Sequence, residues 1–236
     1  MTATSPITNV SPPAAATAST EYPSEMRVLL HGVSWETYER LLEEVEQGRN
    51  KLFAYCDGVL EIMVPLEGHE RSTRIFEHFL GAIVDELGLE MLSLGSLTMK
   101  DAKKKMGLEP DCCFYIANES AVREVDRLDF EIHPPPDLAI EVDNSSISLN
   151  KFPIYVALKI PEIWRLRRGT LTIYRLNDVG LQYEECDCSL AFPQIPVQEL
   201  PQFIERAQAI GQRATVREFI KRLQEMLAGT EGDRSS

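Results

Sequence analysis

Two short segments with acidic residues at their ends decide how this chain folds. The first reads GLEPDCCFYI and covers residues 107–116, and the second reads DLAIEVDNSSISLNKFPIY and covers residues 137–155. Each contains a continuous apolar run, which is typical of a strand buried on both faces of a sheet. The ionisable residues beside the two runs are Glu109, Asp111, Glu141, Asp143 and Lys151.

The positions of these acids predict a metal site. Glu141 and Asp143 are two residues apart, so they point to the same face of the sheet if the strand continues. Buried carboxylates are costly unless a cation pairs with them. Mg²⁺ takes oxygen ligands and is usually held by one or two carboxylates together with waters and substrate phosphates. We therefore expect Asp111, Glu141 and the carbonyl group of Val142 to bind Mg²⁺ or Mn²⁺.

Lys151 lies within the second segment, at the start of a predicted helix. A lysine beside a metal site can orient the attacking water or stabilise the negative charge that develops on a phosphate during hydrolysis. A simpler interpretation stays open at this point, because an acid at a strand end is often only a cap or a salt-bridge partner.

The other segments predict helices and strands around this centre. Asp57-Gly58 between two apolar runs is a strong signal for a β-hairpin, since a type I′ turn requires positive φ at both positions. Residues 91–99 read as one strand, and the residues from 163 to 186 read as a meander of alternating strands. The apolar spacing predicts helices within residues 34–48, 68–88, 150–160, 200–207 and 215–226.

Composition suggests a single domain with flexible ends. Residues 1–24 are rich in Ala, Ser, Thr and Pro and lack periodicity, which is typical of a disordered leader. Residues 229–236 read as a flexible polar tail, so we expect one domain over residues 25–228. The chain contains no apolar run of the roughly 18 residues that a membrane span needs. Five cysteines without C-x-x-C spacing predict reduced thiols in a cytoplasmic protein rather than a zinc site.

The formal net charge of −13 argues against tight non-specific binding of nucleic acid. The positive charge is nevertheless clustered in two places, which suits a phosphodiester substrate or, equally, a solvated surface. The two clusters are Lys100, Lys103, Lys104 and Lys105, and Arg165, Arg167 and Arg168.

Three stretches together resemble the Uma-type putative restriction endonuclease family, a former domain of unknown function in the PD-(D/E)XK nuclease superfamily. They are AYCDGVLEIMVPLEGHERS at residues 54–72, the segment at residues 107–116, and the segment from residue 137 to residue 166. The resemblance implies an α/β fold with a restriction-endonuclease-like central mixed β-sheet flanked by helices, to which we expect the β-meander to be added. It also implies a divalent-metal site at the edge of the sheet.

The resemblance also implies roles for individual residues. Asp111 matches the aspartate of the family's first motif and Glu141 the acid of its second motif, and both would be metal ligands. Asp143 stands where the superfamily lysine is usual, so Lys151 is the candidate replacement for that lysine. In the predicted helix over residues 68–88, His69 and Glu70 match a histidine-glutamate pair, and Glu70 would support the catalytic centre.

These observations predict a Mg²⁺-dependent endonuclease that hydrolyses phosphodiester bonds of DNA, with Asp111, Glu141, Lys151, Glu70 and Asp143 as site residues. A homodimer is expected because cutting both strands usually needs two sites. Two alternatives stay open. One is a catalytically inactive nuclease fold that serves as a binding or assembly module, and the other is a metal-dependent hydrolase of a substrate other than DNA.

Overall fold

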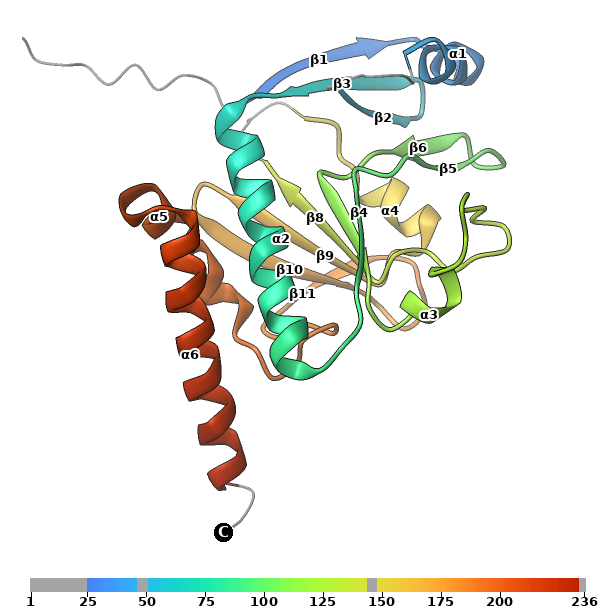
Figure 1. Cartoon of the computed structure of the whole chain (residues 1–236). Coiled ribbons are helices and arrows are strands. Elements are labelled where there is room, and N and C mark those ends of the chain that lie inside the picture. The colour runs from blue at the N-terminus through green and yellow to red at the C-terminus, as the bar shows by residue number, and fades with distance from the viewer. Residues whose placement is uncertain (1–24, 46–50, 144–147, 234–236) are drawn as a thin grey trace, which may run out of the picture.

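A computed structural model of the chain describes residues 25–45, 51–143 and 148–233. The predicted leader at residues 1–24 lies outside the described residues. The fold is α/β, as predicted, and it contains two sheets whose strands are joined by helices (Figure 1). None of the helices within these ranges has the length and apolar character that crossing a membrane would require.

The first sheet is antiparallel throughout. It carries the β-hairpin predicted at Asp57-Gly58, where φ is 49° at Asp57 and 77° at Gly58. This confirms that both turn residues adopt the positive φ of a type I′ turn. In spatial order its strands are β1 (Glu25–His31), β3 (Val59–Pro65), β2 (Leu52–Cys56), β6 (Met106–Leu108) and β5 (Met99–Asp101).

The second sheet is mixed. Its one parallel pair is β8 and β9, and α4 (Phe152–Leu158) connects these two strands. The predicted meander is present as β9, β10 and β11, and it forms one half of this sheet rather than a separate addition. In spatial order the strands are β11 (Tyr183–Cys186), β10 (Thr170–Leu176), β9 (Glu162–Arg167), β8 (Leu138–Val142), β7 (Cys112–Tyr115) and β4 (Leu92–Gly95).

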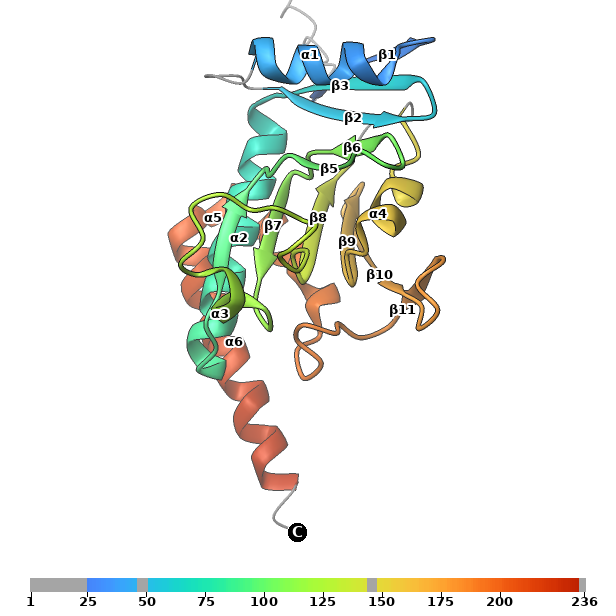
Figure 2. The same ribbon diagram turned by 90° about the vertical axis from the view of Figure 1, so that its right-hand side faces the viewer.

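Helices cover the two faces of the second sheet unequally. One face packs against α2 (Glu67–Leu87), α5 (Leu200–Ile210) and α6 (Gln212–Asp233), and this layer forms the largest apolar core (Figures 1 and 2). The other face packs against α4 and the inner face of the first sheet. Because strand side chains alternate, Ile140 and Val142 enter the large core, whereas Glu141 points to the side where the two sheets meet.

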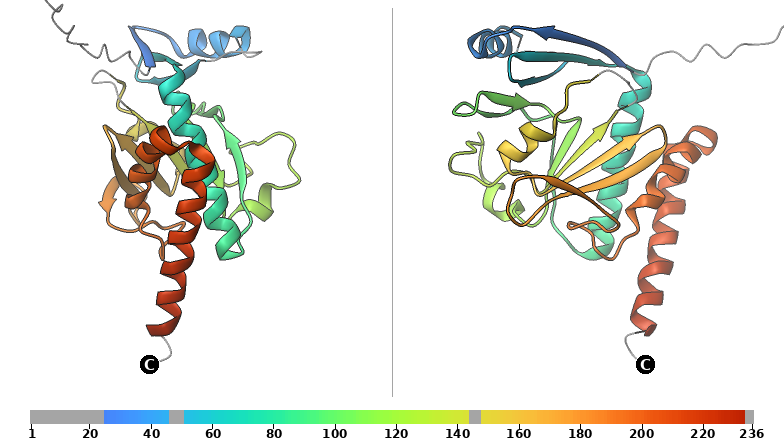
Figure 3. Two further views of the ribbon diagram at one scale, coloured as in Figure 1. Left: turned by 60° about the vertical axis from the view of Figure 1, so that its left-hand side comes forward. Right: turned by 180° about the vertical axis from the view of Figure 1, so that it is seen from behind.

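The remaining helices lie at the periphery. α1 (Trp35–Val45) packs on the outer face of the first sheet, and α3 (Glu119–Val122) precedes the proline-rich connection to β8. A 3-10 turn, η1 (Val197–Glu199), leads into α5. The last part of α6 extends beyond the body of the protein in every view (Figure 3).

Three expectations about the elements need correction. The segment at residues 91–99 is two strands rather than one, because Gly95 has a φ of 59° and the chain passes from the second sheet to the first after it. α6 continues to Asp233, so residues 229–233 are helical and not part of a tail. The strand β1 was not expected, although EMRV at its start alternates polar and apolar residues.

Candidate active site

Asp111 lies at the start of β7, where it faces the neighbouring strand β8 and the first turn of α2. Its Oδ2 accepts a 2.6 Å hydrogen bond from the backbone N–H of Val142. His69 Nε2 lies 3.1 Å from the same oxygen, so the two side chains form an ion pair when the imidazole is protonated. Oδ1 of Asp111 is buried and has no hydrogen-bond partner among the described residues. This carboxylate therefore has one oxygen with capacity for a ligand.

Glu141 lies at the end of β8 and is bound by two side chains of α4 and its cap. Lys151 Nζ donates a 2.6 Å hydrogen bond to Oε2 of Glu141, and the hydroxyl of Tyr155 donates to Oε1. Lys151 and Tyr155 are four residues apart at the start of a helix, so they lie on the same face. The sequence predicted Lys151 but not Tyr155, although the four-residue spacing was a signal for it.

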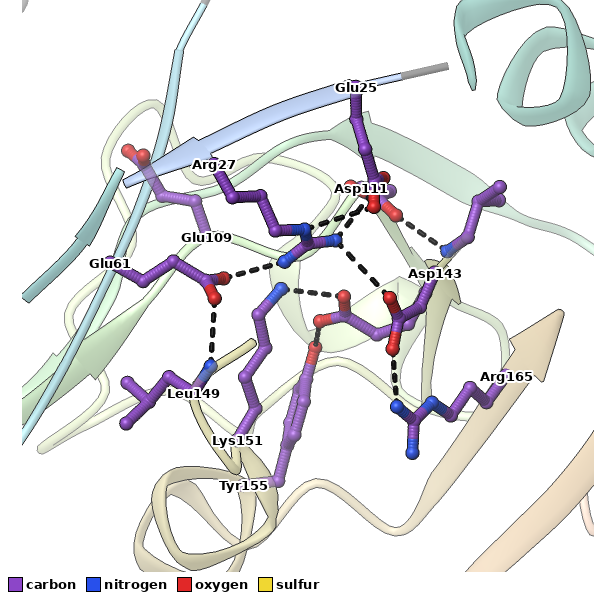
Figure 4. A network of polar contacts seen from close by, with 12 residues as sticks. Glu25, Arg27, Glu61, Glu109, Asp111, Asp143, Leu149, Lys151, Tyr155 and Arg165 are labelled. Carbon is purple, nitrogen blue, oxygen red and sulfur yellow. Dashed lines mark hydrogen bonds and ion pairs between the residues drawn. The ribbon is translucent and has the colours of Figure 1, made fainter. Parts of the chain in front are cut away.

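Asp143 lies two residues after Glu141 and faces the same side, as the strand periodicity predicted. Its Oδ2 accepts a hydrogen bond from Arg165 of β9. Its Oδ1 lies 3.7 Å from the guanidinium group of Arg27, which comes from β1 of the other sheet (Figure 4). Asp143 is thus held between two arginines.

Arg27 contacts carboxylates of both sheets. Besides Asp143, which follows β8 of the second sheet, it binds two acids of the first sheet. It contacts Glu25 on its own strand at 3.0 Å and Glu61 of β3 at 2.7 Å. The other oxygen of Glu61 accepts a 2.8 Å hydrogen bond from the backbone N–H of Leu149 (Figure 4). We define the charge cluster as Glu25, Arg27, Glu61, Asp111, Glu141, Asp143, Lys151 and Arg165.

The charge cluster carries more negative than positive charge. It contains five carboxylates and three permanent cations, and its carboxylates are at least nine-tenths buried. Buried carboxylates without a counter-ion are strongly disfavoured. Burial acts to lower the pKa of His69, but Asp111 raises it above its usual value, and protonation of this imidazole reduces the excess from two negative charges to one.

The pKa values of the central groups follow from their neighbours. Burial acts to raise the pKa of Asp111, but His69, Lys151 and the Val142 N–H outweigh it and hold that pKa below its usual value. Burial raises the pKa of Glu141, with Lys151 opposing the rise. Burial acts to lower the pKa of Lys151, but Glu141 and Asp111 raise it, so the ammonium group stays charged.

Glu70 and Glu109 lie apart from this cluster. Glu70 points to solvent from the first turn of α2, with half of its side chain exposed and Arg74 at 4.0 Å. His69, its neighbour in sequence, makes the contact with Asp111 instead. Glu109 is buried and accepts hydrogen bonds from the backbone of Phe53 and the hydroxyl of Thr98, so it ties the first sheet together.

Two cavities reach different residues of the charge cluster. A broad one of about 1610 Å³ reaches Asp111 and His69, and its wall includes Glu70. A smaller one of about 260 Å³ reaches Glu141, Lys151 and Asp143. The candidate metal ligands Asp111 and Glu141 therefore open to different cavities.

The lysines at residues 100–105 do not form an unpaired basic rim. Each contacts an acidic side chain: Lys100 binds Glu39, Lys103 binds Glu131, Lys104 binds Asp101, and Lys105 binds Glu36. In the second basic cluster, Arg165 belongs to the charge cluster, whereas Arg167 and Arg168 are exposed.

The donor set fits a hard divalent cation with few protein ligands. Within residues 25–45, 51–143 and 148–233, no three His, Cys, Asp or Glu side chains form a group that could hold a metal. Mg²⁺ needs only one or two carboxylates, since waters and substrate phosphates complete its octahedron. Among the described residues, Oδ1 of Asp111 has no hydrogen-bond partner, whereas both oxygens of Glu141 accept a hydrogen bond and would bind a metal through their remaining lone pairs. All five cysteines are free thiols, and three of them are buried.

Comparison with known proteins gives one family. The model of the family described as "Uma2: Putative restriction endonuclease" matches residues 35–209, well over half of the chain. No curated protein matches. One similar solved structure is described as a putative nuclease belonging to DUF820 from Anabaena variabilis. It is 13% identical, the match covers 70% of this chain and 90% of that one, and the TM-score is 0.42. The chain belongs to the Uma2 family of putative restriction endonucleases.

Proposed function

We propose that this protein is a nuclease that hydrolyses phosphodiester bonds of DNA and depends on Mg²⁺ or Mn²⁺. One observation carries the proposal: Asp111, Glu141 and Lys151 come from three separate elements and meet in one buried cluster. The excess negative charge of this cluster supports a cation at its centre. The family supports the nuclease class.

Asp111, Glu141 and the carbonyl of Val142 would hold the metal ion. When bound, a divalent cation polarises the phosphoryl group and lowers the pKa of water. The chain's own residues position these groups. The Val142 N–H and His69 fix Asp111, and Tyr155 orients Glu141.

Lys151 supplies the positive charge beside the reacting phosphate. Its ammonium group is held at 2.6 Å from Glu141 and remains charged, so it can donate to the attacking water or to the phosphate oxygens. Asp143 keeps Arg165 beside this centre through its Oδ2, and its buried Oδ1 has no hydrogen-bond partner among the described residues. Glu70 lies in the wall of the larger cavity and would contact a substrate that binds in this cavity.

The paired state of the lysines at residues 100–105 favours a second candidate, a metal-dependent hydrolase of a substrate other than DNA. A DNA-binding surface obtains much of its affinity by neutralising phosphates with basic side chains. Here the four lysines are already neutralised by acids. Cleavage of a small phosphodiester without cleavage of duplex DNA would select this candidate.

The test combines calorimetry with a cleavage assay. We expect Mg²⁺ or Mn²⁺ to bind the wild-type chain, and binding and duplex cleavage to be lost in Asp111→Ala and Glu141→Ala. Asp126→Ala is the matched control, because Asp126 is an exposed acid in the wall of the same large cavity. Wild-type cleavage by Asp111→Ala would refute the assignment. Metal binding that requires DNA would indicate a site completed by substrate, whereas no binding in either condition would indicate the inactive alternative.

A further inference from the structure

The edge strand β1 has two faces with different surroundings. Glu25 and Arg27 point inward to the charge cluster. Met26, Val28 and Leu30 alternate with them and are 60%, 54% and 42% exposed. We call these three side chains the β1 stripe. Soluble proteins ordinarily cover or interrupt an exposed apolar row on an edge strand, so the β1 stripe indicates a surface that binds something.

The β1 stripe continues into β3. The register places Val64, Ile62 and Leu60 directly opposite Met26, Val28 and Leu30. Leu60 is fully buried with α1, whereas Ile62 and Val64 are only partly buried. α1 therefore covers the end of this face near Leu30 and leaves the end near Met26 open.

The backbone of β1 restricts what can cover the stripe. Among the described residues, β1 pairs with β3 alone and lies at the end of its sheet. Its other edge presents N–H and C=O groups at the spacing that another strand satisfies. The occupant that fits both the edge and the stripe is a strand with apolar side chains at alternate positions. β1 itself has that pattern.

We propose that the β1 stripe is a dimer interface, in which β1 pairs antiparallel with β1 of a second copy about a two-fold axis at Val28. This register places Val28 opposite Val28, and Met26 opposite the partner's Leu30, so the shared face is apolar throughout. On the other face, Glu25, which keeps its contact with Arg27, lies opposite the partner's His31. The interface is isologous, and it joins the two first sheets into one.

The pairing has a consequence for the candidate active site. Glu25 and Arg27 belong to the strand that forms the interface. The charge cluster of each copy would therefore lie against the inner face of the paired β1 strands. The proposal does not depend on the proposed nuclease chemistry, because it rests on the edge strand and the exposed side chains alone.

The first test measures the mass of the full chain in solution by light scattering after gel filtration. We expect a dimer for the wild type and half that mass for Val28→Lys, because a lysine in the stripe would be buried beside its own symmetry mate. Val179→Lys is the matched control, since Val179 is 71% exposed in the connection between β10 and β11. This control should remain a dimer, and circular dichroism should show all three chains folded.

The second test examines the register through a disulfide. Directly opposed residues in an antiparallel pair have Cα atoms about 4.5–5.5 Å apart, within the range that a disulfide spans. Val28→Cys should therefore form a covalent dimer under mild oxidation. Met26→Cys should not, because Met26 lies opposite Leu30 rather than itself, and the wild type gives the background from the native thiols.

Several outcomes would overturn the proposal. A monomeric wild type would mean that another occupant, such as a different part of this chain, covers the stripe. A dimer that persists in Val28→Lys would place the interface elsewhere. Equal cross-linking of Val28→Cys and Met26→Cys would exclude the two-fold register at Val28.

Discussion

Two groups of cations in this protein differ in how they are paired and in what they can do. Lys100, Lys103, Lys104 and Lys105 are close together in sequence and bind acids at the surface. Arg27, Lys151 and Arg165 come from three different elements, β1, the start of α4 and β9, and meet between buried carboxylates. The comparison shows that clustering of charge along a chain does not identify the cations that act together.

The energetic consequences of the two groups also differ. An exposed pair is hydrated and screened by salt, so its contribution to stability is small. A buried pair has lost its hydration, and removal of one partner leaves the other charge without compensation. The comparison therefore predicts a ranking of mutational effects.

Arg27→Ala should cause the largest loss of stability, because it leaves Glu25 and Glu61 buried without their guanidinium partner. We expect the free energy of unfolding in urea to fall by about 3–5 kcal/mol. Arg40→Ala is the control, since Arg40 and Glu44 form a pair whose side chains are 77% and 65% exposed, and its unfolding free energy should be unchanged within error. Equal losses of unfolding free energy in the two variants would contradict the expected difference between buried and exposed ion pairs. The loss in Arg27→Ala should also persist at high salt.

Lys151→Met should lower the free energy of unfolding less than Arg27→Ala does, because the hydroxyl of Tyr155 continues to donate a hydrogen bond to Glu141. We expect a loss of about 1–3 kcal/mol, the cost of one unsatisfied buried group. Mg²⁺ should restore more stability to Lys151→Met than to the wild type, since a cation that binds only the folded state stabilises it. Thermal unfolding with and without Mg²⁺ measures this difference. Equal shifts in both proteins would argue against a metal beside Lys151.

Lys103→Ala should give the smallest effect. Lys103 and Glu131 are separated by 2.8 Å, yet their side chains are 82% and 73% exposed. Urea unfolding should therefore not distinguish the variant from the wild type, at low or at high salt. A measurable loss would show that the lysines at residues 100–105 contribute more to the fold than their exposure indicates.

Local patterns predicted the parts of the fold that local physics controls. The hairpin at Asp57-Gly58 formed because both residues accept positive φ. Glu141 and Asp143 share a face because strand side chains alternate. In contrast, residues 91–99 divide between two sheets, and no local signal tells which sheet each half joins.

The candidate site was only partly predictable for the same reason. Asp111, Glu141 and Lys151 stand beside apolar runs and could be named from the sequence, and the structure brings them together. Arg27 comes from a strand that was not expected and that lies outside the residues matched by the family. His69, rather than Glu70, contacts Asp111, because the orientation of α2 decides which of two adjacent residues faces the strand.

The sequence by itself determined the hairpin, the helices α1, α2, α4, α5 and α6, and the acids that flank the central strands, because propensity and periodicity act over a few residues. The α/β class followed from the resemblance to the family. Only the tertiary structure decided which charges meet, since Arg27, Glu61, Glu141 and Lys151 come from elements that pair through long-range packing. Burial then determines which of these charges require a counter-ion. That requirement, rather than any run of residues, defines the candidate active site.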